Sequence, residues 1–402
     1  SRHLSQVVVA TQVRNKAAIA QAGMGMADVV FLDTEYIARP IWKISSFFKF
    51  GPANATAIRY PVAYAFEREV WKTFGKELLD NKFDIVHRVT PISAAQPSPL
   101  ASWSPLPFVI GPVNGGLPYP PAFQSVLAKE GEWLRYVRKA HEMLPYAGNT
   151  YRRAKAIHAA FDHTINTLPH ECMERAINFP ENGVDPGRFT KPVVEKSQDK
   201  LTFLFAGRLV PFKCADVAIS AFAESEMLRK HALAIVGDGP ERASLEKMVR
   251  SRHLEECVTF YGWRDQQEVA EMMRSAHAFV FPSIRDSGAG VIIEAMMSGL
   301  PCIVIDYGPA KDLVSHDSGI KIPLGTRDAH IHGVRSAMEK IAGDPSLSMT
   351  LGAAARNRAL EHFTWDVKAQ QIVEVYRWVL GERADKPVFD LHQDDGRRLG
   401  AG

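Results

Sequence analysis

Residues 281–305 of this chain read FPSIRDSGAGVIIEAMMSGLPCIVI. The apolar run Ala278–Phe281 predicts a buried strand, and the apolar stretch after the loop predicts a helix that ends at Gly299, because Pro301 cannot continue it. The loop between them consists of small residues, so backbone N–H groups can approach an anion there, and the helix N-terminus adds a partial positive charge. The stretch therefore predicts a βα unit of a parallel sheet with an anion site at its turn.

Two acidic residues, Asp286 and Glu294, stand eight positions apart on either side of this turn. Glu294 falls about one turn into the predicted helix, where its carboxylate can accept hydrogen bonds from a pair of sugar hydroxyls. The predicted site therefore suits a ligand with phosphate in its middle and hydroxyl groups at its ends. A sugar nucleotide is such a ligand. An alternative stays open at this point, because glycine-rich turns are common in parallel α/β folds and Asp286 can simply cap the helix.

The composition excludes several classes of protein. A chain of 402 residues is long enough for two domains, and 46% hydrophobic with 23% charged residues is typical of a globular protein. A net charge of +3 is too small to argue for a nucleic-acid partner. The four cysteines are scattered, which predicts no disulfide framework or zinc site and favours the cytoplasm. No run of about 18 apolar residues is present.

Short strands alternating with helical segments indicate βαβ units and parallel sheets in both halves of the chain. In the first half, the strand-like runs are Gln6–Ala10, Val29–Leu32, Asp84–Val89, Phe108–Ile110 and His163–Asn166. In the second half, they are Leu201–Phe205, Ala232–Val236, Val258–Tyr261, Ala278–Phe281 and Cys302–Ile305. Since the chain begins without Met and soon enters a strand-like run, we expect a further strand and glycine loop to precede it.

These patterns predict the domain boundaries. We expect an N-terminal domain over residues 1–182, a linker over 183–200, a C-terminal domain over 201–362, a helix over 363–381 that returns toward the first domain, and a disordered tail over 382–402.

Two further turns of the second half are candidates for ligand binding. Gly207 permits a tight turn directly after a strand, and Arg208 and Lys213 then place two cations at the carboxyl edge of the sheet, where open α/β sheets bind ligands. Both side chains suit a diphosphate, although each is also an ordinary surface cation when taken alone. The turn after Val236 reads GDGPER and lacks the third glycine of a nicotinamide-binding fingerprint, which argues against a dehydrogenase.

Taken in order, the motifs of the second half resemble those of the retaining, nucleotide-sugar-dependent glycosyltransferases with the GT-B architecture, the glycogen-synthase-like group 1 or family 4. The motifs are GRL…K at 207–213, VGDGPER at 236–242, FYGW at 260–263, PS at 282–283, EAMMSGLP at 294–301 and FTWD…Y at 363–376. The resemblance implies an α/β fold of two Rossmann-like parallel-sheet domains facing across a cleft.

The resemblance also implies roles for single residues. Arg208 and Lys213 would bind the donor diphosphate and stabilise the leaving nucleotide, and Glu294 would hold the ribose. Asp286 stands where the family usually has Glu near the transferred sugar, so this chain departs from the pattern at that contact. The remaining donor-binding residues would be Gly207, Gly237, Gly288, Ala289, Gly290 and Val291. No metal or other cofactor is implied, since arginine, lysine and helix N-termini neutralise the phosphate charge.

The first domain matches less closely and would face the acceptor. FDIVH at 83–87 and GPVNGG at 111–116 resemble acceptor-side segments, so the acceptor-side candidates are His87, Asn114, Gly115 and Gly116. A histidine satisfied in the domain interior is the alternative for His87, and a flexible turn is the alternative for the other three. Two basic segments with aromatic residues, 39–50 and 133–155, suit either contact with an anionic membrane surface or ordinary solvated helices.

The resemblance therefore predicts transfer of a hexose from a nucleoside diphosphate sugar to a hydroxyl, with retention of configuration. We expect a glycan, a lipid-linked sugar or a small molecule as acceptor, in bacterial cell-envelope glycan or glycolipid synthesis at the inner face of the membrane. Two alternatives remain, an inactive nucleotide-sugar-binding scaffold and a GT-B sugar-nucleotide epimerase.

Overall fold

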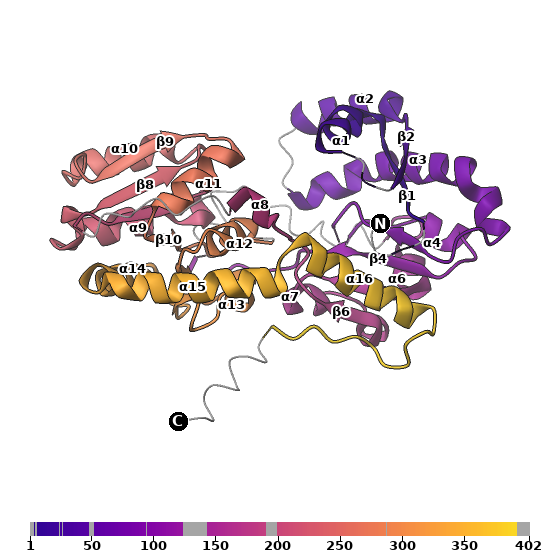
Figure 1. Cartoon of the computed structure of the whole chain (residues 1–402). Coiled ribbons are helices and arrows are strands. Elements are labelled where there is room, and N and C mark those ends of the chain that lie inside the picture. The colour runs from indigo at the N-terminus through magenta and orange to yellow at the C-terminus, as the bar shows by residue number, and fades with distance from the viewer. Residues whose placement is uncertain are drawn as a thin grey trace. The chain divides into compact units, whose positions relative to one another are not determined.

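The computed structural model describes residues 4, 6–23, 25, 27–47, 52–93, 95–123, 143–189, 199–286 and 288–391. The chain forms two compact units (Figure 1). Among the described residues, unit 1 draws its members from Ser1–Gly116, Glu130–Phe179 and Ala369–Phe389, and unit 2 from Leu117–Lys129, Pro180–Lys368 and Asp390–Gly402.

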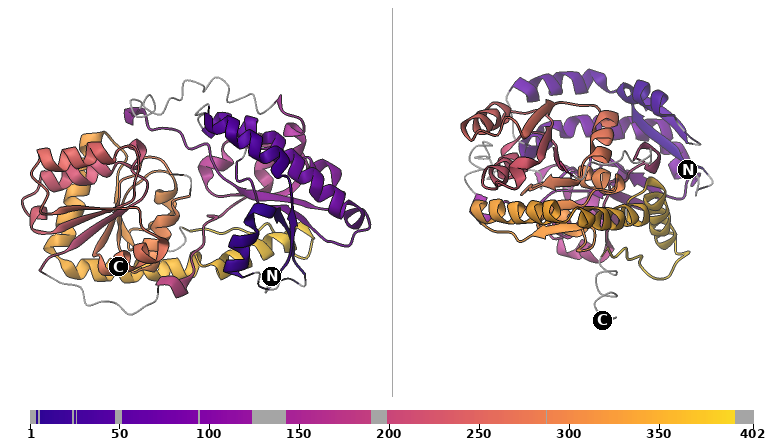
Figure 2. Two further views of the ribbon diagram at one scale, coloured as in Figure 1. Left: turned by 90° about the horizontal axis from the view of Figure 1, so that it is seen from above. Right: turned by 60° about the vertical axis from the view of Figure 1, so that its left-hand side comes forward.

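Unit 2 is built on a six-stranded sheet in the order β12-β11-β10-β7-β8-β9, and every paired strand is parallel. Its strands are β7 (Thr202–Ala206), β8 (Ala232–Val236), β9 (Val258–Gly262), β10 (Ala278–Phe281), β11 (Cys302–Ile305) and β12 (Gly319–Ile322). The central strands are apolar and buried, as in sheets covered by helices on both faces. Figure 2 shows these strands side by side between helices.

Among the described residues of unit 2, one α-helix precedes the first strand, one follows each of the first five strands, and two follow the last strand. They are α8 (Pro186–Phe189), α9 (Ala215–Ala223), α10 (Arg242–Ser251), α11 (Gln266–Ser275), α12 (Gly290–Met297), α13 (Pro309–Leu313), α14 (Arg327–Gly343) and α15 (Pro345–His362). The five strands predicted for this half are confirmed, and β12 was missed because Gly319–Ile322 is short and contains Lys321.

The strand order of unit 2 reverses at β7. From β7 the chain runs outward through β8 to β9, then returns to β10 on the other side of β7 and continues outward to β12. Loops that leave the carboxyl ends of β7 and β10 therefore lead to helices on opposite faces of the sheet. A crevice opens at such a switch point, which is where open α/β sheets bind ligands.

Unit 1 contains a four-stranded parallel sheet in the order β3-β4-β5-β6 and a separate parallel pair, β1-β2. Its strands are β1 (Val8–Gln12), β2 (Asp28–Leu32), β3 (Val86–Arg88), β4 (Phe108–Val113), β5 (Ala154–Ala159) and β6 (Ala176–Asn178). Its helices include α1 (Lys16–Ala22), α2 (Glu35–Phe47), α3 (Pro52–Leu79), α4 (Leu100–Trp103), α6 (Ala147–Arg153) and α7 (Asp162–Ile165). The prediction of two parallel-sheet α/β domains is confirmed.

Two sequence predictions for unit 1 need correction. The strand predicted at His163–Asn166 is wrong, because Asp162–Ile165 forms α7, and the buried strand is Ala154–Ala159. The disordered tail is wrong for residues 382–391, because Arg383 pairs with Glu374 at 2.8 Å and Phe389 packs on Phe179. Residues 392–402 lie outside the described part of the chain.

The C-terminal helix α16 (Trp365–Val379) completes unit 1 from its residue Ala369 onward. Val375 is fully buried against Val109, Ala156 and Ile177 of the unit 1 sheet. The described part of the predicted linker, residues 183–189, belongs to unit 2, since α8 contacts α11 and α12 and Phe189 is buried. Residues 190–198 lie outside the described part.

Candidate active site

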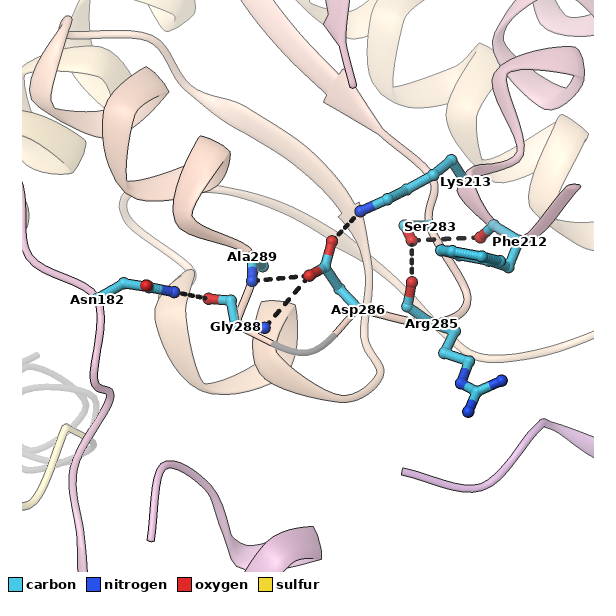
Figure 3. A network of polar contacts seen from close by, with 8 residues as sticks. All are labelled: Asn182, Phe212, Lys213, Ser283, Arg285, Asp286, Gly288 and Ala289. Carbon is cyan, nitrogen blue, oxygen red and sulfur yellow. Dashed lines mark hydrogen bonds and ion pairs between the residues drawn. The ribbon is translucent and has the colours of Figure 1, made fainter. Parts of the chain in front are cut away.

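The loops that follow β7 and β10 are joined at the switch point of unit 2 (Figure 3). The backbone carbonyl of Phe212 accepts a hydrogen bond from the Ile284 N–H at 3.0 Å and another from the Ser283 hydroxyl at 3.2 Å. A third link is the ion pair between the Lys213 ammonium and the Asp286 carboxylate. The sequence predicted both loops as ligand-binding, and the structure brings Lys213 and Asp286 into direct contact.

The Asp286 carboxylate is surrounded by donors of the protein itself (Figure 3). Its Oδ1 accepts the backbone N–H groups of Gly288 at 3.2 Å and Ala289 at 2.9 Å, while Oδ2 accepts from Lys213. The expectation that the Gly288 and Ala289 N–H groups face a ligand is therefore corrected. Among the described residues, no acceptor takes the N–H groups of Gly290 and Val291, which open α12, so these remain directed at the anion site.

Lys213 is held from two sides. Its side chain is only 14% exposed, and the ammonium lies 4.6 Å from the centroid of the Phe281 ring at the end of β10. Arg208, in contrast, is exposed, and its guanidinium makes no hydrogen bond within the part of the chain that the structure describes. The two predicted diphosphate ligands thus differ, since one is fixed in advance and the other is free to reach an incoming ligand.

The glycine loop is also tied to the segment that enters unit 2. The Asn182 side-chain amide donates to the Gly288 carbonyl at 2.9 Å. A Cβ on Gly288 would stand 2.4 Å from Asn182 Nδ2 and 2.6 Å from Glu181 Oε1, so a larger residue would displace both side-chain ends. Ala289 itself adopts a left-handed conformation with φ +47°. Glycine at position 288 therefore leaves room for the Asn182 contact, in addition to any ligand contact.

Glu294 lies on α12 and is partly buried. Its Oε1 accepts a hydrogen bond from the Gln266 side-chain amide at 2.9 Å. Gln266 opens α11, which starts at a capping box formed by Asp265 and Glu268. Burial raises the pKa of Glu294 above its ordinary value, and the Gln266 hydrogen bond opposes this shift. Gln266 was not predicted from the sequence, although the D-x-x-E capping pattern that places it is visible there.

The glycine turns after β7 and β8 pack directly on each other. Gly207 donates its N–H to the Val236 carbonyl at 3.0 Å, and Gly237 donates to the Gly262 carbonyl at 2.8 Å. Gly237 has φ +128°, and a Cβ there would stand 1.9 Å from the Gly207 carbonyl oxygen. Close approach of two backbones therefore explains Gly237, and it brings the turns after β7, β8 and β9 together at one edge.

Residues 117–123 were assigned to the first domain by the sequence, but they lie on unit 2. The Tyr307 hydroxyl donates to the Pro118 carbonyl at 2.7 Å, and Phe123 stacks on His330 with ring centroids 5.2 Å apart. The Arg285 guanidinium lies 4.4 Å from the Tyr119 ring centroid, beside Asp286. Sequence reasoning missed Arg285 and Tyr119 because their contact joins positions far apart in the chain.

His87 lies within unit 1 with both ring nitrogens engaged. Nε2 lies 2.7 Å from the Gly111 carbonyl oxygen, to which it must donate, and Nδ1 lies 2.6 Å from the Tyr376 hydroxyl, from which it then accepts. Burial lowers the pKa of His87 to about 4, so the ring is neutral at physiological pH. The geometry favours the interior histidine that the sequence left open, rather than an acceptor-side base.

The other acceptor-side candidates form a turn over α7. The Thr164 hydroxyl donates to the Gly115 carbonyl at 2.9 Å, and a Cβ on Gly116 would stand 2.3 Å from the Thr167 methyl group. Asn114 is buried, and its N–H donates to the Ile92 carbonyl at 2.7 Å. The turn is thus fixed by packing rather than flexible.

Several predictions concern other parts of the chain. Ser287 and residues 44–50 and 133–142 of the two basic segments lie outside the residues whose side chains are described. In the described part, no group of three or more His, Cys, Asp or Glu residues is arranged to hold a metal ion. No described helix has the length and apolar character needed to cross a membrane.

Comparison with known proteins identifies the segment that carries this site. Residues 188–358 match the family described as glycosyl transferases group 1. Unit 2 contains a glycosyl transferases group 1 domain. The match includes Arg208, Lys213, Asp286 and Glu294, so the candidate site lies inside the group 1 domain.

Curated relatives match over a similar stretch. The chain is 30% identical over 197 residues to D-inositol 3-phosphate glycosyltransferase of Streptomyces bingchenggensis, covering 44% of this chain and 40% of the relative. It is 30% identical over 178 residues to N-acetyl-alpha-D-glucosaminyl L-malate synthase of Bacillus anthracis, covering 44% and 42%. The match thus spans less than half of these relatives.

Solved structures resemble both units of the chain. HepE of Anabaena in complex with UDP has a TM-score of 0.60 at 18% identity and covers 91% of this chain and 90% of its own. Sucrose-phosphate synthase of Thermosynechococcus elongatus has a TM-score of 0.57 at 19% identity, covering 80% and 79%. These structural matches cover more of the chain than the group 1 domain does. They show that the fold of the chain is the α/β architecture of GT-B glycosyltransferases.

Proposed function

We propose that this protein is a glycosyltransferase that moves a sugar from a nucleoside diphosphate to a hydroxyl acceptor. The observation that carries the proposal is the set of groups at the switch point of the group 1 domain. Arg208 and Lys213 follow β7, and the open N-terminus of α12 and Glu294 follow β10. Cations and free N–H groups suit a diphosphate, and a carboxylate suits vicinal hydroxyls.

In this proposal the chain's residues act mainly on the leaving group. As the glycosidic bond to the diphosphate breaks, negative charge grows on the departing oxygen. Arg208, Lys213 and the Gly290 and Val291 N–H groups stabilise that charge, an effect worth several kcal/mol when the donors are oriented beforehand. Glu294 holds the ribose, so the diphosphate stays in reach of the cations.

The finer chemistry follows the resemblance of the motifs. The transferred group is a hexose, and its anomeric configuration is retained by attack from the same face as the leaving diphosphate. The departing phosphate oxygen then accepts the proton of the acceptor hydroxyl. Relatives named D-inositol 3-phosphate glycosyltransferase and N-acetyl-alpha-D-glucosaminyl L-malate synthase support a small-molecule acceptor. The Anabaena structures with UDP and glucose support a nucleotide sugar as donor.

A peripheral contact with an anionic membrane is part of the same proposal. The described portion of α2 exposes Tyr36 at 64% and Trp42 at 44%, with Arg39 on the same helix. Exposed aromatic and basic side chains on one helix suit the interface of a membrane. This placement favours synthesis of a cell-envelope glycan or glycolipid at the inner membrane face.

A specific observation supports a second candidate, a binding scaffold without transferase activity. Lys213 is already neutralised by Asp286, which leaves Arg208 as the one cation of the pair without a carboxylate partner among the described residues. A scaffold would bind the nucleotide sugar and release nothing, whereas a transferase slowly hydrolyses its donor even without an acceptor.

The test is a panel of UDP-, GDP-, ADP- and dTDP-sugars scored for released nucleoside diphosphate and for thermal stabilisation. We expect release from one donor and a loss of at least about 100-fold in Arg208→Ala, because one oriented donor to a transition-state charge is worth that much. Stabilisation without release, even with cell-extract acceptors, would establish the scaffold. Neither effect with any donor would overturn both candidates.

A further inference from the structure

Most of the hydrogen-bonding capacity of the Asp286 carboxylate is already used by donors of the protein itself. Four donor contacts are available to a carboxylate, and three are filled by Gly288 N–H, Ala289 N–H and the Lys213 ammonium. The side chain is 18% exposed. Its surroundings are therefore those of a group that organises the loop and a neighbouring cation, and they differ from those of a group that waits for a ligand.

We propose that Asp286 is a positioning residue, which fixes Lys213 and the glycine loop for the donor diphosphate instead of contacting the transferred sugar. The inference rests on the proposed function, since it assigns how that site is organised. It also gives a physical reason for aspartate at this position, where the resembling family has glutamate.

Aspartate suits the loop because its side chain is short. An aspartate reaches the N–H groups two and three residues later in the chain, as in an Asx turn. Those are the N–H groups of Gly288 and Ala289. An additional methylene in glutamate carries the carboxylate past them toward the space in front of the loop. The difference of one methylene thus decides whether the carboxylate accepts hydrogen bonds from the loop or contacts the ligand.

The same carboxylate sets the charge that the diphosphate meets. Lys213 reaches the site from the β7 loop, and its pairing with Asp286 orients the ammonium against the Phe281 ring. An incoming diphosphate must share Lys213 with Asp286. Asp286 therefore weakens binding of the diphosphate while keeping its cation in place for the transition state, in which the leaving group carries more charge.

Three substitutions separate these roles. Asp286→Asn keeps an oxygen for the two N–H groups and removes the charge opposite Lys213. Asp286→Glu keeps the charge and loses the short loop contact. Asp286→Ala loses both. Asp306→Asn is a matched control, because Asp306 also follows a strand of this sheet and faces a lysine, Lys321, at 3.8 Å.

The first readout is the affinity of each variant for free UDP, GDP, ADP and dTDP, which carry no sugar. For the nucleotide that binds the wild type, we expect Asp286→Asn to bind about three- to tenfold more tightly, since a nearby negative charge is removed. We expect its kcat to fall about tenfold or more without a rise in the donor KM, because Lys213 is no longer oriented. Asp306→Asn should match the wild type in both.

Two results would overturn the proposal. A carboxylate that contacts only the sugar predicts unchanged nucleoside diphosphate affinity in Asp286→Asn, and it predicts that Asp286→Glu keeps or raises kcat. Hydrogen exchange of the Gly288 and Ala289 amides tests the loop contact without any ligand. It should quicken in Asp286→Ala and Asp286→Glu and stay slow in Asp286→Asn, and equal exchange in all variants contradicts the inference. If no nucleotide binds the wild type, the proposed function fails while this exchange test still decides the loop contact.

Discussion

The two acidic side chains of the site differ in how much of their hydrogen-bonding capacity is already used within the protein. Among the described residues, the Glu294 carboxylate accepts one hydrogen bond, from Gln266 to Oε1, so its other oxygen remains for ribose hydroxyls. Asp286 already accepts from three donors, the N–H groups of Gly288 and Ala289 and the Lys213 ammonium. The sequence could place both acids at one sheet edge because their spacing follows from a strand, a turn and a helix. It could not assign their partners, since Lys213 lies 73 positions before Asp286 and Gln266 lies 28 positions before Glu294.

Replacing Glu294 with alanine should weaken binding of the nucleoside diphosphate by about 10- to 100-fold, because hydrogen bonds to a charged group are worth about 1.5–3 kcal/mol. Titration calorimetry on the wild type and the variant measures this directly. Glu271→Ala is the control, since Glu271 pairs with Gln267 on the exposed side of α11, the helix that carries Gln266. Equal affinity in Glu294→Ala would remove Glu294 from the ribose site.

Burial also predicts how this site responds to acid. The pKa of Glu294 is raised, so its carboxylate takes up a proton at a higher pH than an ordinary glutamate does. A protonated carboxyl accepts ribose hydroxyls less well. Nucleotide affinity in the wild type should therefore begin to fall, on acidification, at a higher pH than an ordinary glutamate would cause, and this fall should be absent in the alanine variant.

The strands of unit 2 were predicted except β12, and β1 to β4 of unit 1 were predicted as well, whereas β5 and β6 were missed. Each strand of unit 2 is a short apolar run followed by a helix, so local pattern and tertiary role agree. In unit 1, the strand Ala154–Ala159 directly follows the basic end of α6 and contains Lys155 and His158, which obscured its apolar pattern. Residues 163–166 were predicted as a strand, but Asp162–Ile165 forms a helix. A single helical turn needs only one apolar face to pack on a sheet, so a pattern this short does not separate the two.

The glycine turns yield a prediction about the elements they join. Gly237→Ala forces a Cβ to within 1.9 Å of the Gly207 carbonyl oxygen and places alanine at φ +128°. The loops after β7 and β8 must then separate, so we expect a loss of about 3 kcal/mol or more in the free energy of unfolding. Urea unfolding measures it.

Gly343→Ala provides the comparison for that experiment. Gly343 ends α14 in the same unit, and a Cβ there meets nothing within 4 Å. Its replacement should leave stability within about 1 kcal/mol of the wild type, since alanine favours helix over glycine. A Gly237→Ala protein as stable as Gly343→Ala would show that the turns do not depend on their close approach.

The path of the whole chain explains why unit 1 depends on its last segment. Unit 1 starts at the N-terminus, yet Val375 and Phe389 complete its core after the chain has traversed unit 2. A hydrophobic run such as that of α16 is visible in the sequence. Its partner is not, because the contact joins positions almost the full chain apart. The hydrogen bond between His87 on β3 and Tyr376 on α16 spans 289 positions.

Burial of the His87 ring makes the stability of unit 1 depend on pH, because burial disfavours the protonated ring. His87 has a pKa of about 4 in the folded chain and about 6.5 when unfolded, so the unfolded chain binds the additional proton between these values. The contribution of neutral His87 to the free energy of unfolding is fully present above pH 6.5. It is lost as pH falls toward 4, by up to about 3 kcal/mol at 1.36 kcal/mol per pH unit.

His87→Gln can keep a donor to Gly111 but does not titrate. We therefore expect its unfolding free energy to fall less between pH 7 and 5 than that of the wild type, whereas His332→Gln, at an exposed helical position, should keep the wild-type slope. Hydrogen exchange of the β3–β6 amides during urea unfolding reports the unfolding free energy of unit 1 at each pH. If this free energy changes equally with pH in all three proteins, His87 is excluded as the source of the pH dependence.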